Sequence, residues 1–184
     1  MRPERPYLAE ARVVADESAA AIVGMEVALG RRAPNSAAVA AAWRALVDRV
    51  ERDAFDLSEA TLLALHAPLV ATPVSAFGPG VGGCTGWAGY LDELGWVADE
   101  DALDGAAFVL GQLANGGYVD DGAVSLGFLA SNGVLLSAGL PAVWPVDADW
   151  SEALEASGPP CWDPEGLRGK VAQAVWRVTG HFVT

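Results

Sequence analysis

The chain has 184 residues and a formal net charge of −13, and 52% of its residues are hydrophobic. This composition is typical of one folded globular domain rather than a disordered chain. The negative charge argues against nucleic acid and anionic membranes as partners, because contacts to phosphate groups need positive charge. The N-terminal arginines are not followed by an apolar run, which argues against a signal peptide and favours a cytoplasmic location.

Apolar residues at helical spacing predict three helices in the N-terminal part of the chain. They are expected over Leu8–Ala28, from residue 36 to about residue 53, and from Glu59 to about Leu69. Gly30 is expected to end the first helix. Asn35 or Ser36 is expected to cap the second helix, and Ser58 the third. A loop rich in Gly and Pro follows from Pro68 to Gly86.

Further helices are predicted in the rest of the chain. They are expected over Trp87–Val97, from the acidic cluster that precedes Ala106 to about Ala114, over Ala123–Ala138, over Trp150–Ala156 with Asp149 as the cap, and over Gly166–Val178. The segment AVWPV, which ends at Val146, is expected to be extended, and the uncharged stretch before it favours a buried core helix rather than a membrane span. No repeat or linker divides the chain, so the fold class is all-α or nearly so, in a single domain over residues 1–184.

Charge is unevenly distributed along the sequence. All eleven Lys and Arg residues lie outside the stretch from Asp53 to Leu167, which is rich in Asp and Glu. Phosphate groups are usually held by cationic side chains or by backbone N–H groups at helix N-termini. This stretch therefore has no Lys or Arg of its own with which to bind a phosphate.

Two groups of residues bear on metal binding or redox chemistry. Four carboxylates, Asp99, Glu100, Asp101 and Asp104, gather before a predicted helix, but Leu103 lies where a calcium loop needs an oxygen ligand. An N-cap with first-turn carboxylates is the simpler interpretation. The two cysteines, Cys84 and Cys161, lack any metal-binding spacing; we expect two reduced, buried thiols, with a disulfide as the alternative. We expect neither a metal nor a cofactor.

A glycine-rich loop, Gly116-Gly117-Tyr118-Val119-Asp120-Asp121-Gly122, leads into the helix that begins at Ala123. A glycine-rich turn at a helix N-terminus is typical of an anion site, but the two carboxylates of this loop would repel an anion.

The same region resembles the signature of the Fic/Doc family of AMP-transferring proteins, H-P-F-x-(D/E)-G-N-G-R-x-x-R followed by an apolar helix ending in A-G-L/Y-P. Here the chain reads GYVDDGAVSLGFLASNGVLLSAGLP, and the spacing matches without a gap. LSEATLLALH and ADESAAAIVGMEV are similar to the family's L-S-x-x-x-L-x-x-L-H helix and to its inhibitory helix. The resemblance covers roughly Ala15 to Glu155. It implies a Fic-like helical bundle in which the family's β-hairpin flap is shortened or absent, because only about Pro68 to Thr85 is left for it.

The family's catalytic residues are largely replaced. Gly117 stands for the catalytic His, Val119 for the anchoring Phe, Ala123 and Val124 for the Asn and Gly of the anion cradle, Ser125 and Phe128 for the two Arg, and Val23 for the glutamate of the inhibitory helix. Only Asp121, the family's metal-binding acid, and Gly122 are retained. AMP transfer needs a base and donors to the phosphates, so we expect none here.

Two hypotheses for function follow. In the first, the old active site binds or converts a small non-nucleotide molecule, with Asp121 or Asp120 as general acid or base and Tyr118 or Ser125 orienting the substrate. Gly117, Phe128 and Asn132 would then line the substrate site. In the second, the protein is an inactive regulatory or protein-binding scaffold, with a protein partner or a homodimer, and the same residues are structural: Asp121 caps the helix, Ser125 and Asn132 satisfy backbone groups, and Tyr118 belongs to the core. His66, on an apolar helix, is expected to be a core histidine.

Overall fold

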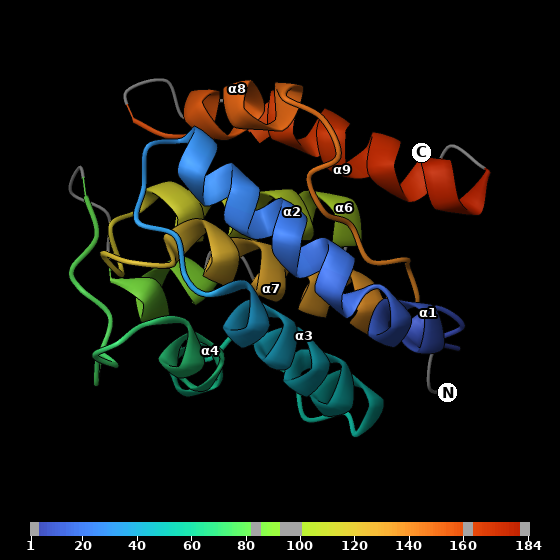
Figure 1. Ribbon diagram of the computed structural model, residues 1–184, viewed down its shortest axis with the longest axis horizontal. Coiled ribbons are helices and arrows are strands. Elements are labelled where there is room, and N and C mark those ends of the chain that lie inside the picture. Colours follow the sequence, from blue (N-terminus) through green and yellow to red (C-terminus); the bar gives the residue numbers. More distant parts are fainter. Residues whose placement is uncertain (1–3, 82–85, 93–100, 160–163, 181–184) are drawn as a thin grey trace.

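The computed structural model describes residues 4–81, 86–92, 101–159 and 164–180. These residues form only helices, turns and irregular segments (Figure 1). The helices are α1 (Leu8–Val13), α2 (Ala15–Ala28), α3 (Ser36–Glu51), α4 (Glu59–His66), the 3₁₀ helix η1 (Ala67–Leu69), α6 (Ala102–Asn115), α7 (Ala123–Ser137), α8 (Asp149–Ala156) and α9 (Pro164–Thr179). Residues 87–92 are also helical. Since no strand occurs in the described ranges, the prediction of an all-α fold is confirmed.

Helix α7 lies at the centre of the bundle. Its sequence, AVSLGFLASNGVLLS, contains no charged residue, and nearly all of its residues are buried. A helix that is apolar on every side is stable in water only when other elements surround it. Helix α6 packs most extensively on α7, and α2, α3 and α4 cover its other sides (Figure 1). The predicted buried core helix is thus the element around which the others assemble.

Most of the helix ends follow from local sequence. Asn35 Oδ1 accepts a hydrogen bond from Ala37 N at 2.8 Å, and Ser58 Oγ accepts one from Thr61 N at 3.3 Å, so both predicted caps are confirmed. Asp101 caps α6 by accepting from Leu103 N at 2.8 Å. This bond supports the simpler interpretation of the acidic cluster, of which Asp99 and Glu100 lie outside the described residues. Gly30, with a φ of 67°, ends α2 as expected.

Three predicted helix boundaries are corrected by the structure. The first predicted helix is broken at Val14, because the indole of Trp43 donates to the carbonyl oxygen of Ala11 at 2.7 Å and occupies an acceptor of the continuing helix. The third ends its α-helical part at His66 and finishes as the 3₁₀ turn η1, which contains Pro68. Asp149 is not a cap: it lies in the first turn of α8, where it pairs with Lys170 at 3.0 Å.

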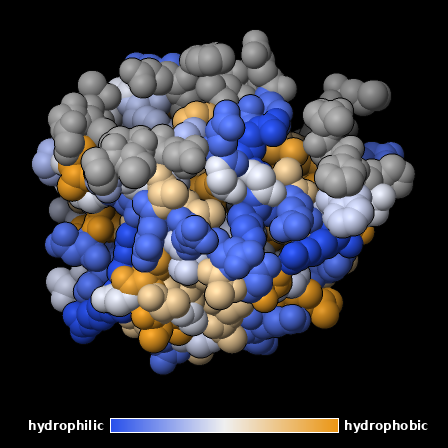
Figure 2. Space-filling view, turned by 90° about the horizontal axis from the view of Figure 1, so that it is seen from above, coloured by the Kyte–Doolittle hydropathy of each residue, from blue (hydrophilic) through white to orange (hydrophobic). Residues whose placement is uncertain are grey.

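None of the described helices is both long enough and apolar enough to cross a lipid bilayer. Figure 2 shows one face of the molecule, on which polar residues are widespread and smaller apolar areas lie between them. The predicted helix over Trp87–Val97 is described only to Asp92, and Cys84 and Cys161 lie outside the described ranges.

Candidate functional site

The glycine-rich loop between α6 and α7 is hydrogen-bonded to an irregular segment, residues 77–81, which lies well before it in the sequence. Gly78 N donates to Tyr118 O at 2.8 Å, and Val81 N donates to Gly116 O at 2.8 Å. Phe77 N donates to the Glu59 carboxylate at 2.6 Å, which ties the segment to α4. No strand is present in residues 68–81, where the resemblance predicted a shortened or absent flap, and residues 82–85 are outside the described part of the chain.

Gly117 occupies the position at which the resemblance places a catalytic base. Its φ is 69°, in the left-handed region that favours glycine. A Cβ atom at this position would lie 2.7 Å from Val81 Cγ1, which is closer than side chains approach one another. Neither this backbone conformation nor its surroundings therefore suit a histidine, and the replacement by glycine belongs to the packing of the loop.

Tyr118 belongs to an aromatic cluster in the core. Its side chain is buried, and its ring centroid lies 5.8 Å from that of Phe77 and 5.4 Å from that of Trp87. Trp87 is itself fixed by a hydrogen bond from Nε1 to Leu57 O at 2.8 Å. The Tyr118 ring thus anchors the loop, as the structural alternative predicted for this residue.

Ser125 meets a buried carboxylate that the sequence did not lead us to expect. Glu26, on α2, is fully buried, and its Oε1 accepts hydrogen bonds from Ser125 N at 2.9 Å and from Ser125 Oγ at 3.2 Å. The N–H groups in the first turn of a helix have no partner within the helix and readily bind anions. The protein's own carboxylate therefore occupies the anion-binding end of α7.

The environment of Glu26 disfavours its charged form. Burial raises the pKa of the Glu26 carboxyl above its ordinary value, and the two bonds from Ser125 and the charge of Arg31 oppose this shift only in part. Its second oxygen, Oε2, has no hydrogen-bond partner among the described residues. The resemblance had placed Val23 at the acidic position of this helix and predicted no carboxylate there. That expectation is wrong, because Glu26, almost one helical turn later, reaches the start of α7.

Phe128 and Asn132 are buried side chains of α7 that contact the rest of the protein. The Phe128 ring packs on Trp150 of α8, with centroids 5.5 Å apart. Asn132 Nδ2 donates to Phe128 O and to Val143 O, both at 2.8 Å, while its Oδ1 accepts from Val143 N at 2.6 Å. Asn132 thus joins the segment after α7 to the helix, and both side chains are fully buried.

Basic residues reach the loop from the connection between α2 and α3. Arg31 donates to Asn115 Oδ1 at 2.8 Å and also to Ala114 O, and Arg32 pairs with Asp121 at 3.2 Å. In the folded protein, positive charge from Arg31 and Arg32 therefore lies next to the stretch that has no Lys or Arg of its own. Both arginines, however, are already bonded to groups of the protein.

Asp120 and Asp121 lie at the surface, beside two adjoining hollows of about 250 and 140 Å³. Arg32 and Asp121 line both hollows, and His66 and Asp120 line the smaller one. His66 Nε2 lies 2.7 Å from Asp121 O, and since a carbonyl oxygen only accepts, Nε2 carries the proton. Ser125, His66 and Asp121 do not form a catalytic triad, because Ser125 bonds Glu26 and His66 bonds the backbone.

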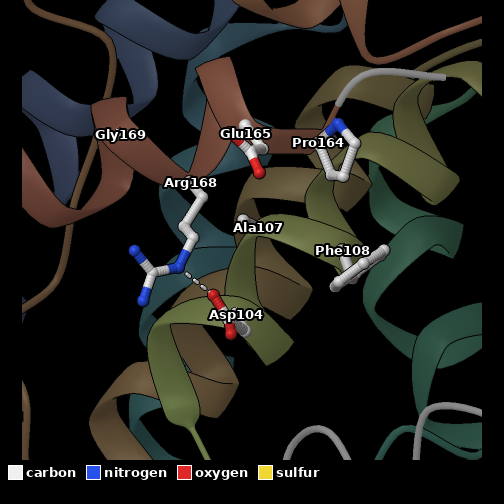
Figure 3. Close-up of a pocket in the computed structure, with 7 residues that line it drawn as sticks. All are labelled: Asp104, Ala107, Phe108, Pro164, Glu165, Arg168 and Gly169. Carbon is white, nitrogen blue, oxygen red and sulfur yellow. Dashed lines mark hydrogen bonds and ion pairs between the residues drawn. The ribbon is translucent and has the colours of Figure 1, made fainter.

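A larger hollow of about 400 Å³ lies between α6 and α9 (Figure 3). Phe108 and Pro164 form part of its wall, and Arg168 points across it to Asp104. Arg168 also pairs with Asp101 at 3.3 Å. The one basic residue that lines this hollow, Arg168, is thus paired with two carboxylates. None of the residues that the sequence suggested as catalytic or substrate-binding lines the hollow. Within the described residues, no three His, Cys, Asp or Glu side chains are grouped as a metal site would require.

Comparison with protein-family models, with curated proteins and with solved structures finds no match to this chain. The likeness to the Fic/Doc family rests on the motif spacing of the chain itself.

Proposed function

We propose that this protein is a Fic-like helical-bundle protein without AMP-transfer activity, and that it binds a small, polar, non-nucleotide molecule in the hollow beside Asp120 and Asp121. The observation that carries this proposal is the meeting of Arg32, His66 and the two aspartates at one surface hollow. These residues come from separate parts of the chain. The other candidates, Tyr118, Ser125, Phe128 and Asn132, are buried in the core.

Several features of the loop speak against a nucleotide as the ligand. A phosphate group at the start of α7 would compete with Glu26 for the Ser125 N–H. Arg31 and Arg32 already bond protein groups, and Asp120 and Asp121 would repel an anion. Gly117, at the position of the family's catalytic base, has no side chain that could take up a proton. Incubation with labelled ATP and candidate target proteins is therefore expected to give no transfer of label, and stoichiometric transfer would contradict the proposal.

The protein is proposed to bind the small molecule and, in addition, to convert it by acid–base catalysis. Carboxylates and imidazole are the side chains that most often move protons in enzymes. Asp120 and Asp121 lie beside the same space, so either one is within reach of a molecule held there.

A thermal-shift screen against metabolites of different charge tests this proposal. A ligand of the hollow is expected to raise the melting temperature of the wild-type protein, and this shift should be reduced in Asp121→Asn. Glu152→Gln is the matched control, because it also removes one exposed carboxylate but lies on α8. A set of metabolites that gives no shift, or a shift equally large in Asp121→Asn, contradicts the proposed site.

A protein-binding scaffold is the second candidate, and the exposed apolar residues beside α2 favour it. Val13 is 83% exposed and Val27 is 62% exposed, near the two ends of this helix. An exposed apolar side chain such as that of Val27 offers a contact to a protein partner. If a scaffold role holds, Val27→Glu should abolish self-association or partner capture by the full chain, whereas a protein that stays monomeric and captures no partner excludes it.

A further inference from the structure

Helix α9 (Pro164–Thr179) lies at the edge of the bundle, where it packs mainly on α6 and α8 (Figure 1). We propose that α9 is a cover held in place largely by ion pairs, and that it opens as a unit while the rest of the chain stays folded. Opening separates the two walls of the hollow between α6 and α9. This inference does not depend on the small-molecule site beside Asp120 and Asp121.

The apolar contact of α9 with the bundle is narrow. Of its 16 residues only Leu167, Val171 and Val175 are buried, and they follow one another at intervals of four along one side of the helix. The central helix α7, by contrast, is buried on almost every side. Hollows of about 400 and 130 Å³ remain along the contact between α9 and α6. Few buried apolar side chains are typical of segments that open locally.

Ion pairs supply much of the remaining attachment. All three basic residues of α9 pair with aspartates of the stretch that has no Lys or Arg of its own: Lys170 with Asp149 at 3.0 Å and Asp147 at 3.5 Å, Arg177 with Asp147 at 3.5 Å, and Arg168 with Asp101 at 3.3 Å and with Asp104. Glu165 is the one acidic residue of the helix, so α9 is positively charged in a protein with a net charge of −13. Ion pairs at the surface are individually weak and are screened by salt. The attachment of α9 therefore depends on ionic strength.

Two glycines weaken α9 as a helix. Gly166 and Gly169 are exposed and lie in its first half. Outside the helix itself, no described residue has an atom within 4 Å of a Cβ placed at either position, so packing does not require glycine there. Glycine inside a helix is less favourable than alanine, because it loses more backbone entropy on folding. Helix α9 therefore combines a narrow apolar contact with a low helical stability of its own.

Native-state amide hydrogen exchange of the full chain, followed by NMR, tests the inference. Relative to their rates in an unfolded chain, the amides at residues 170–178 should exchange about a hundredfold faster than those at residues 127–136 of α7, because they need only the local opening. Gly169→Ala should slow the exchange of both groups about fivefold, since alanine favours the closed helix over both the open and the unfolded states.

Gly24→Ala is the matched control, because Gly24 is also exposed within a helix, α2, and has no atom within 4 Å of a Cβ placed there. It should slow the exchange of the α7 amides and leave that of the α9 amides unchanged, because α2 stays folded when α9 opens. Equal slowing of both groups by Gly24→Ala would show that α9 exchanges only through global unfolding, and would overturn the inference.

Salt and a charge variant test the role of the ion pairs. Raising the NaCl concentration from about 0.05 M to about 0.5 M should speed the exchange of the α9 amides, because the pairs are screened. Lys170→Gln should speed it about two- to fivefold at low salt. Arg44→Gln makes the same change in net charge but removes the pair with Asp16 between α3 and α2, so it should leave the α9 rates unchanged. Exchange in α9 that responds neither to salt nor to Lys170→Gln, or that responds equally to Arg44→Gln, overturns the attachment by ion pairs.

Discussion

The buried Glu26–Ser125 contact makes a prediction in which the sign of a pH effect can be worked out. The folded-state pKa of Glu26 is raised above 4.5, chiefly by burial. A group whose pKa is raised on folding stabilises the fold most below its unfolded pKa, and this contribution is lost as the pH rises through the folded pKa. The free energy of unfolding is therefore expected to fall as the pH rises above about 4.5, where the carboxyl of the unfolded chain begins to ionise.

Replacement by glutamine isolates this effect. Glu26→Gln keeps an oxygen that accepts from Ser125 N and Oγ, and its NH₂ group reproduces the neutral acid at the position of Oε2, which has no partner in the described structure. The variant and the wild type should be equally stable below about pH 4.5. The variant should then become progressively more stable than the wild type as the pH rises. Other carboxylates titrate in both proteins, so they cancel in the difference.

Replacement by alanine measures the hydrogen bonds instead. Glu26→Ala leaves the buried N–H of Ser125 without its acceptor, which costs about 1–3 kcal/mol. Loss of the buried methylene adds about 1 kcal/mol. Glu26→Ala should therefore lower the free energy of unfolding by about 2–4 kcal/mol at low pH, where no charge is buried in the wild type.

Urea unfolding of the three proteins between pH 4 and pH 8, followed by circular dichroism, checks both expectations. A difference between wild type and Glu26→Gln that does not change with pH would show that Glu26 does not titrate in this range. A Glu26→Gln protein that is less stable than the wild type at pH 7 would show that the ionised carboxylate is stabilised by Ser125 and Arg31, and would refute the reasoning.

Three further predictions concern stability. Gly117→Ala should lower the free energy of unfolding by about 1–2 kcal/mol, because residue 117 has a positive φ and the new Cβ would contact Val81. In urea unfolding, adding Val81→Ala should restore part of this loss. If the effects of the two substitutions simply add, the contact is excluded. Asn132→Ala should cost about 2–4 kcal/mol by leaving Val143 N and O unsatisfied, with faster proteolysis of residues 139–146; an unchanged cleavage rate would contradict this role. Trp43→Phe should cost about 1 kcal/mol by removing the bond to Ala11 O, and a calorimetric melting temperature equal to that of the wild type would refute it.

Much of the helical framework could be predicted from local sequence. The uncharged run of α7 fixes its burial, and side-chain caps such as Asn35 and Ser58 mark where helices begin. The break at Val14 could not be predicted in this way. It depends on Trp43, which is distant in sequence and reaches Ala11 only after α3 has packed beside α1.

The candidate site shows the same division between local and long-range information. Asp120 and Asp121 follow from the loop sequence, but their neighbours Arg32 and His66 are brought in by the packing of other elements. Glu26 was missed because its role depends on the register of α2 against α7, which a motif aligned to Val23 does not contain. Four other candidates were suggested by their spacing along the loop and α7: Tyr118, Ser125, Phe128 and Asn132. Spacing alone does not show that these side chains are buried in the core.

The central claim, a small-molecule site beside Asp120 and Asp121, is tested most directly by locating a bound ligand on the protein. Amide NMR of the full chain with a ligand found in the screen should show saturable changes at residues 70–74 and 117–122, and these changes should be lost in Asp121→Asn. Changes confined to the hollow between α6 and α9, or changes that persist unaltered in Asp121→Asn, would contradict the account.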